Sequence, residues 1–154
     1  MTFASRVLFA SATILASAIA SQALAHITVQ PPESRAGGYQ VLRFGVGHGC
    51  AGKATTAVTI QIPASVASAH PQPKPGLTLA AEHPKDAPDR VSAITWRGNL
   101  AADEFDEFLI HVRLPADAGR LAFPALQTCG GETVRWTGET SAAPAPVVVL
   151  QPAP

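Results

Sequence analysis

The chain has 154 residues, with eleven Lys and Arg, eleven Asp and Glu, and a formal net charge of zero at neutral pH. A neutral chain offers no electrostatic basis for binding the phosphate backbone of a nucleic acid, so we exclude nucleic acids as partners. Hydrophobic residues make up 47% of the sequence, which suits one domain with a hydrophobic core.

The first 25 residues have the composition of a signal peptide. Arg6 carries their only charge, an apolar run follows over residues 7–19, and Ala23-Leu24-Ala25 has the small-x-small pattern of a signal peptidase site. The apolar run is shorter than the roughly 20 residues that span a membrane. We therefore expect cleavage after Ala25, a mature protein that begins at His26, a periplasmic or secreted location, and no membrane span after cleavage.

Several segments of the mature chain alternate apolar and polar residues with a period of two, which is typical of strands with one buried face. Within 56–62, for example, Val58, Ile60 and Ile62 fall on one side. The pattern predicts about eight strands, over residues 26–30, 42–46, 56–62, 76–81, 91–96, 107–114, 120–126 and 133–137.

Pro and Gly separate these segments, and no part of the mature chain has a convincing helical period. Short strands with dense turn signals indicate an all-β fold, an antiparallel β-sandwich of the immunoglobulin or cupredoxin kind. We assign residues 26–140 to this domain. Residues 141–154 are rich in Ala and Pro and fit either a final strand or an extended arm.

Cys50 and Cys129 are the only cysteines. An even pair in an exported chain favours a disulfide because the compartment is oxidising. Closing a loop of this length would stabilise the fold by roughly 4 kcal/mol on the chain-entropy model. The alternative is that a thiolate binds copper, as in blue-copper sites, but the wide separation of the two cysteines is not a metal-ligand spacing.

A histidine at a mature N-terminus supplies two nitrogens from one residue, the α-amine and the imidazole Nδ1. Both kinds of group hold their protons loosely near neutral pH, so a metal displaces them readily. Nitrogen donors in a planar arrangement suit Cu(II), which stands at the top of the divalent affinity order. His26 is thus a candidate copper ligand, and the alternative is that it is simply the residue that follows the cleavage site.

A set of short motifs follows in order from His26 to about Trp136: His26-Ile27-Thr28-Val29-Gln30-Pro31, Gly38-Tyr39, His48-Gly49-Cys50, Ile62-Pro63, Pro73-Lys74-Pro75-Gly76, Ile94-Thr95-Trp96, Glu104-Phe105-Asp106-Glu107-Phe108, Arg113-Leu114-Pro115, Phe123-Pro124, Gln127-Thr128-Cys129 and Val134-Arg135-Trp136. In this ordered set the sequence resembles the YcnI-like family of exported bacterial copper-binding domains. No single motif is diagnostic, but the set is specific.

The resemblance implies a β-sandwich that binds Cu(II) through the mature N-terminal His26, with Trp136 beside the metal. An indole has no lone pair for a metal, so Trp136 would shield the ion or tune it. Other family members carry an acidic residue directly after the position of Cys50, where this chain has Ala51. Either that ligand is lost or another group replaces it, with His48 the nearest candidate and Glu33 a more distant one.

The remaining conspicuous residues fit structural roles. Trp96 ends an apolar alternation and is expected to pack in the core. The acidic residues of 104–107 alternate with phenylalanines and are expected to form a solvated edge. Three histidines, two of them in Pro-rich loops and one on an outward strand face, are expected to be solvent-exposed: His70, His83 and His111.

These features together predict a copper-binding protein of the cell envelope that sequesters Cu(II) or passes it to another carrier, and that is not an enzyme. One alternative is a copper-dependent oxygenase with a histidine brace, which needs a second imidazole and an exposed aromatic surface. Another is a structural sandwich module without metal. The sequence contains no Gly-x-Ser-x-Gly elbow and no His-Glu-x-x-His pair, so hydrolytic functions are not supported.

Overall fold

A computed structural model describes residues 26–138 and 143–153, so the predicted signal peptide and its cleavage site lie outside the described part. The described residues form strands, turns and bends, and they include no helix long and apolar enough to cross a membrane. Residues 26–138 and 143–153 contain twelve strands: β1 (Thr28–Gln30), β2 (Glu33–Arg35), β3 (Tyr39–Val46), β4 (Thr55–Gln61), β5 (Ser68–Pro71), β6 (Thr78–Glu82), β7 (Ala93–Leu100), β8 (Asp106–Arg113), β9 (Gly119–Ala122), β10 (Ala125–Cys129), β11 (Glu132–Trp136) and β12 (Val147–Gln151).

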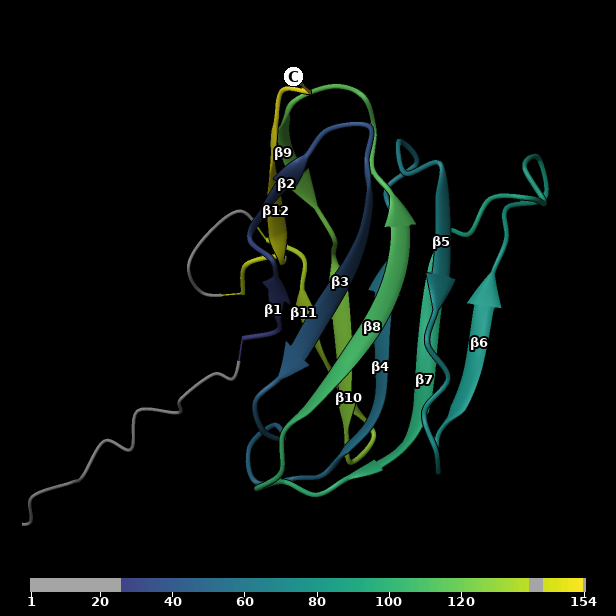
Figure 1. Cartoon of the computed structure of the whole chain (residues 1–154). Coiled ribbons are helices and arrows are strands. Elements are labelled where there is room, and N and C mark those ends of the chain that lie inside the picture. Colours follow the sequence, from purple (N-terminus) through teal and green to yellow (C-terminus); the bar gives the residue numbers. More distant parts are fainter. Residues whose placement is uncertain (1–25, 139–142, 154) are drawn as a thin grey trace, which may run out of the picture.

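The strands form a sandwich of two larger sheets with a smaller one at one end (Figure 1). The four-stranded sheet has the order β1-β3-β8-β5, and the five-stranded sheet behind it has the order β11-β10-β4-β7-β6. The three-stranded sheet has the order β2-β12-β9. All pairings are antiparallel except that of β2 with β12.

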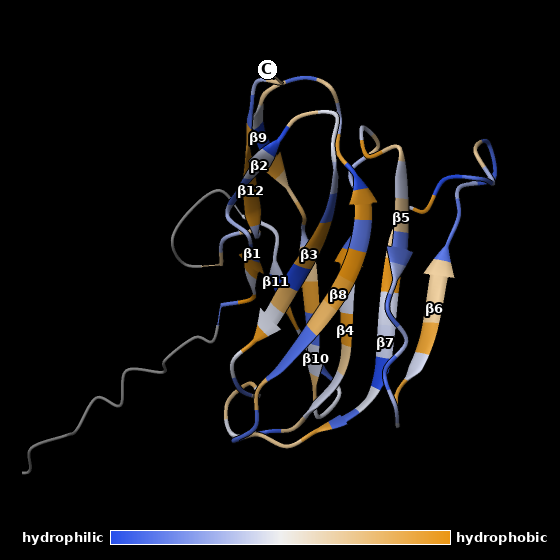
Figure 2. Ribbon diagram, viewed as in Figure 1, coloured by the Kyte–Doolittle hydropathy of each residue, from blue (hydrophilic) through white to orange (hydrophobic). Residues whose placement is uncertain are grey.

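The core lies between the two larger sheets, because each strand turns its apolar residues inward. On β3 this places Leu42, Phe44 and Val46 in the core, as the alternation predicts, and Figure 2 shows the apolar bands along β3 and β8. Trp96 of β7 and Phe108 of β8 meet across the sandwich, with ring centroids 5.3 Å apart. Apolar burial of this kind is the main stabilising term of the fold.

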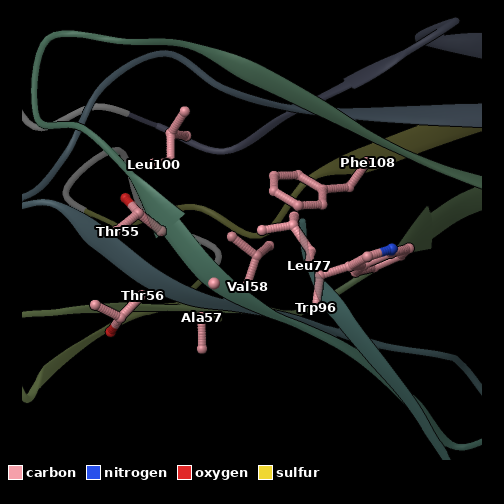
Figure 3. A pocket seen from close by; sticks show the side chains of 9 residues that line it. Thr55, Thr56, Ala57, Val58, Leu77, Trp96, Leu100 and Phe108 are labelled. Carbon is pink, nitrogen blue, oxygen red and sulfur yellow. The ribbon is translucent and has the colours of Figure 1, made fainter. Parts of the chain in front are cut away.

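Trp96 has the predicted structural role. Its side chain is 1% exposed, and its Nε1–H donates to the backbone oxygen of Gln72 at 3.0 Å. A small cavity beside it is drawn in Figure 3. Its volume is about 10 Å³, which leaves room for no more than one water. The cavity is lined by Thr55, Thr56, Ala57, Val58, Leu77, Trp96, Gly98, Leu100 and Phe108.

Four strands go beyond the predicted eight: β2, β5, β12 and one of the two strands that replace the single strand expected over 120–126. The single strand expected over 120–126 is two strands, because Pro124 has no N–H for a ladder and the N–H of Phe123 donates instead to the oxygen of Pro146 at 2.8 Å. β2 and β5 are too short to carry a visible alternation. His70, expected in a loop, lies in β5, and residues 147–151 form the strand β12.

Candidate metal-binding site

His26 lies two residues before the start of β1 and is held in place by its neighbours. Ile27 and Val29 are buried in the core, so the alternate residues His26 and Thr28 lie on the exposed side. β1 pairs with β3 in a register that sets Thr28 opposite Gly45. A short edge strand thus fixes the position of the candidate N-terminal ligand.

Trp136 comes from the end of β11 in the opposite sheet and lies beside His26. The two ring centroids are 5.4 Å apart and the ring planes are tilted by 53°. The indole is 1% exposed, so it closes the inner side of the space around the imidazole. The structure therefore brings together the two residues that the family resemblance pairs.

A surface hollow of about 290 Å³ adjoins His26. It is open because Gly45 and Gly47 present no side chains there, and a methyl group at Gly47 would meet nothing within 4 Å. Phe105, 74% exposed, is its most apolar wall. The residues that line the hollow are His26, Thr28, Gly45, Val46, Gly47, Phe105 and Glu107.

Glu107 is the acidic residue of this hollow. It stands on β8 opposite Gly45, which in turn stands opposite Thr28, so three adjacent strands carry the hollow. No hydrogen bond or ion pair of its carboxylate is found among the described residues, although its backbone oxygen accepts from Lys74 Nζ at 2.7 Å. Sequence reasoning missed Glu107 as a neighbour of His26, because that relationship depends on the register of three strands.

His48 lies in the loop between β3 and β4 and is half-buried. Its Nδ1 is 2.6 Å from the backbone oxygen of Gly49. A carbonyl oxygen only accepts, so Nδ1 carries the hydrogen and Nε2 is the nitrogen left for a metal. His48 does not line the hollow beside His26.

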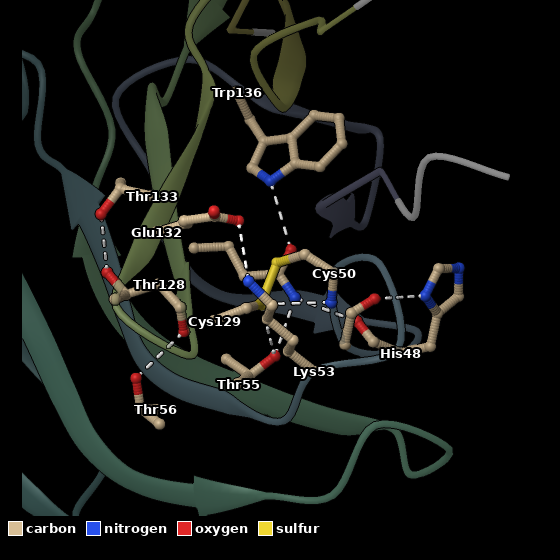
Figure 4. Close-up of a disulfide and its surroundings, with 12 residues drawn as sticks. His48, Cys50, Lys53, Thr55, Thr56, Thr128, Cys129, Glu132, Thr133 and Trp136 are labelled. Atoms are coloured by element: carbon tan, nitrogen blue, oxygen red, sulfur yellow. Dashed lines mark hydrogen bonds and ion pairs between the residues drawn. A yellow bond between two sulfur atoms is a disulfide. The ribbon is translucent and has the colours of Figure 1, made fainter. Parts of the chain in front are cut away.

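Gln127 links the His48 loop to Trp136. Its Nε2 donates to the backbone oxygen of His48 at 2.9 Å and to Thr55 Oγ1 at 2.8 Å. Its Oε1 accepts from the indole Nε1 of Trp136 at 3.4 Å, a contact drawn as a dashed line in Figure 4. Gln127 is 1% exposed, so this network replaces the water that these groups would otherwise bind.

The same loop is joined to β10 by the disulfide between Cys50 and Cys129 (Figure 4). Their Cα atoms are 5.7 Å apart, within the usual range for a disulfide. The backbone N–H of Cys50 also lies 3.2 Å from the sulfur of Cys129. The predicted disulfide is present, and both sulfurs are therefore committed to it and are not thiolate ligands here.

Ala51, which stands where the family resemblance implies an acidic residue, occupies a tight turn. Its φ is 49° and that of Gly52 is 73°, and the N–H of Lys53 donates to the oxygen of Cys50 at 2.9 Å. This left-handed conformation favours Gly, Asn and Asp over Ala. The exposed methyl group of Ala51 offers no donor to a metal.

Glu33 lies apart from the hollow, on β2 of the three-stranded sheet, where Gln151 Nε2 donates to its Oε2 at 3.4 Å. Within residues 26–138 and 143–153, no three side chains of His, Cys, Asp or Glu are grouped so that they could hold a metal ion. In a chain that starts at His26, the α-amine would stand beside the imidazole as a second nitrogen donor.

Comparison with known proteins identifies the family of this chain. A family model described as "Domain of unknown function (DUF1775)" matches residues 26–154. The chain belongs to the DUF1775 family. The copper-binding protein CutI of Bacillus subtilis (strain 168) is 28% identical to it over 124 residues, which cover 78% of this chain and 59% of that protein. The chain thus spans about three-fifths of the length of this curated relative.

A solved structure confirms the fold class. It is the crystal structure of an uncharacterized protein from Nocardia farcinica with an immunoglobulin-like fold, and it is 30% identical to this chain. The TM-score is 0.68, and the match covers 81% of this chain and 97% of the other. The family match and the similarity to CutI also confirm the resemblance to YcnI-like domains. This DUF1775 chain is an immunoglobulin-like β-sandwich.

Proposed function

We propose that this protein binds Cu(II) through the α-amine and the imidazole Nδ1 of His26 after signal peptide removal, and that it sequesters copper or delivers it to another carrier in the periplasm or outside the cell. The observation that carries the proposal is the placement of His26 against Trp136. The family match also starts at His26, the residue that follows the predicted cleavage site.

The chemistry supports copper over other ions. One residue with two nitrogens can form a chelate without the cluster of side chains that a structural zinc site requires. Nitrogen ligands suit Cu(II), and the relative CutI is itself described as a copper-binding protein. The chain shares most of its length with that relative, although it covers only 59% of it.

The surroundings of His26 suit holding and releasing a metal. Trp136 covers one side with an apolar ring that cannot ligate, and the other side faces the open hollow. A half-exposed ion of this kind is accessible to a partner protein. The proposed role needs no catalytic group, so we propose a carrier and not an enzyme.

A chelate from one residue leaves coordination positions that other groups fill. Three side chains are candidates. The first is the imidazole of His48, whose Nε2 is directed away from its own hydrogen bond to Gly49, and the second is the carboxylate of Glu107, which shares the hollow with His26. Glu107 would supply the acidic oxygen that Ala51 cannot. Glu33 is the third, more distant candidate.

The decisive experiment compares a protein that starts at His26 with one that carries Gly-Ser-Gly-Ser before His26. The extension is longer than one or two residues because a histidine in the second or third position forms a different copper chelate. We expect the first protein to bind its tightest equivalent of Cu(II) with nitrogen coupling in the electron paramagnetic resonance spectrum, and the second protein to lack this tight equivalent and its spectrum. Equal spectra from both would contradict the proposal.

Single substitutions identify the other ligands. His48→Ala or Glu107→Gln should each change the spectrum if that group is bound, and His83→Ala is the matched control, because His83 is an exposed histidine outside the site. A melting temperature that does not rise with free Cu(II) would favour the structural module, since a ligand that binds only the native state must stabilise it. Mass spectrometry of the exported protein checks that its first residue is His26.

A further inference from the structure

Two histidines lie directly opposite each other on the outer face of the four-stranded sheet. β5 pairs with β8 in a register that sets His70 against His111. Their neighbours Ala69 and Val112 are buried and both histidines are exposed, so both imidazoles leave the sheet on the same side. Residues opposite each other on antiparallel strands have Cβ atoms about 4.5–5.5 Å apart, a spacing from which two imidazoles can reach one ion.

The surface around this pair is shaped as a shallow hollow of about 360 Å³. Val41 and Leu109 give it apolar walls, and Gln72 adds a side-chain amide. Its full lining is Val41, His70, Pro71, Gln72, Leu109 and His111. The pair is therefore partly surrounded by protein, and the remaining coordination positions of a bound ion would face water.

Tyr39 holds the ring of His111 in place. The two rings are stacked, with centroids 5.4 Å apart and planes 8° from parallel. The guanidinium of Arg113 lies over the ring of Tyr39, 5.7 Å from its centroid. Stacking uses the face of an imidazole, whereas a metal binds in the ring plane at a nitrogen. The stack thus orients His111 without blocking its nitrogens. Arg113 is the nearby positive charge, and the ring of Tyr39 engages it.

We propose that His70 and His111 form a second metal site, for a divalent transition ion that prefers imidazole nitrogen, such as Cu(II) or Zn(II). This site is separate from His26, lies on different strands, and does not need signal peptide cleavage. It goes beyond the proposed function and stands without it. With two protein ligands the site is open and exchangeable, and it would add a second, weaker place for metal on the same molecule.

The test removes the N-terminal chelate first. A protein that starts at residue 26 and carries His26→Ala is titrated with Cu(II) by calorimetry, and its paramagnetic resonance spectrum is recorded. We expect one equivalent, bound by two nitrogens. Adding His70→Ala or His111→Ala should each weaken binding by at least about tenfold. Adding His83→Ala should leave it unchanged.

Each outcome of these titrations either supports or overturns the second metal site. Absence of binding to the His26→Ala protein overturns the second site, as does unchanged affinity after His70→Ala or His111→Ala, or an equal loss after His83→Ala. Both substituted side chains are exposed, so the variants should keep their melting temperature, which verifies that they fold. With diamagnetic Zn(II), the imidazole resonances of His70 and His111 should shift together, which one histidine acting alone would not produce.

Discussion

The imidazole of His26 precedes the first strand of one sheet, and the indole of Trp136 ends a strand of the opposite sheet, yet their ring centroids lie 5.4 Å apart. The sandwich therefore brings the proposed copper ligand and a buried aromatic ring into contact across the edge of the fold. This contact would make Trp136 a reporter for metal at His26.

We expect Cu(II) to quench the fluorescence of the mature protein and Trp136→Phe to remove most of that quenching, because a paramagnetic ion at His26 would lie next to this indole. Trp96→Phe is the matched control, since Trp96 packs against Phe108 in another part of the core. The measurement is a fluorescence titration with Cu(II). Quenching that survives Trp136→Phe and disappears with Trp96→Phe would place the metal elsewhere.

Gln127→Leu should destabilise the protein by about 3 kcal/mol, because it leaves the backbone oxygen of His48, the hydroxyl of Thr55 and the indole N–H of Trp136 without their buried partner. Urea unfolding measures the change in the free energy of unfolding. Gln61→Leu is the control.

The control residue lies on β4, where Gln61 is exposed, so its substitution should change stability by no more than about 0.5 kcal/mol. Similar losses for both variants would mean that the Gln127 network contributes nothing particular to the fold. A loss confined to Gln127→Leu should also loosen the loop that carries His48, which hydrogen exchange of that loop would register.

Gly49→Ala should be destabilising by about 2 kcal/mol, because an added Cβ would lie 2.0 Å from the backbone oxygen of Lys53 and 3.0 Å from the Cα of Ala102. Backbone atoms cannot turn away as a side chain can. Gly47→Ala, two residues earlier, meets nothing within 4 Å and should be neutral or slightly stabilising. Thermal unfolding of the two variants compares them, and equal melting temperatures would refute the steric explanation.

The sequence predicts the parts of the fold in which one strand face is buried over several residues. β3, β4 and β8 each alternate long enough for the pattern to show, and Val58, Ile60 and Ile110 are in the core. β2 and β5 have three and four residues, too few for a pattern, and they form because a neighbouring strand supplies hydrogen bonds. Tertiary pairing therefore decides what local sequence leaves open.

The candidate site likewise contains residues that the sequence predicts and residues that only the structure reveals. The cleavage pattern and the chemistry of an N-terminal histidine predict His26 as a ligand, whereas its pairing with Trp136 comes from the family resemblance, since no local pattern connects residues so far apart in the chain. The nearness of Glu107 to His26, and of His70 to His111, depends on strand register. A shift of one residue would turn these side chains to the other face of the sheet. The sequence predicts the same role, a solvated edge, for all the acidic residues of 104–107. In the structure Asp106 forms an ion pair with Lys74, whereas Glu107 lines the hollow.

The burial of Ile27 has a consequence for how a metal would bind next to it. A mobile N-terminus loses conformational entropy each time it binds an ion. Here Ile27, the residue after the proposed ligand His26, is already buried in the core of the folded protein. Capture of the ion would then require little further ordering, and an unfolded copy of the same chain, which keeps the two nitrogens but must order them, would bind it more weakly. Loss of the native sandwich and loss of copper should thus occur together.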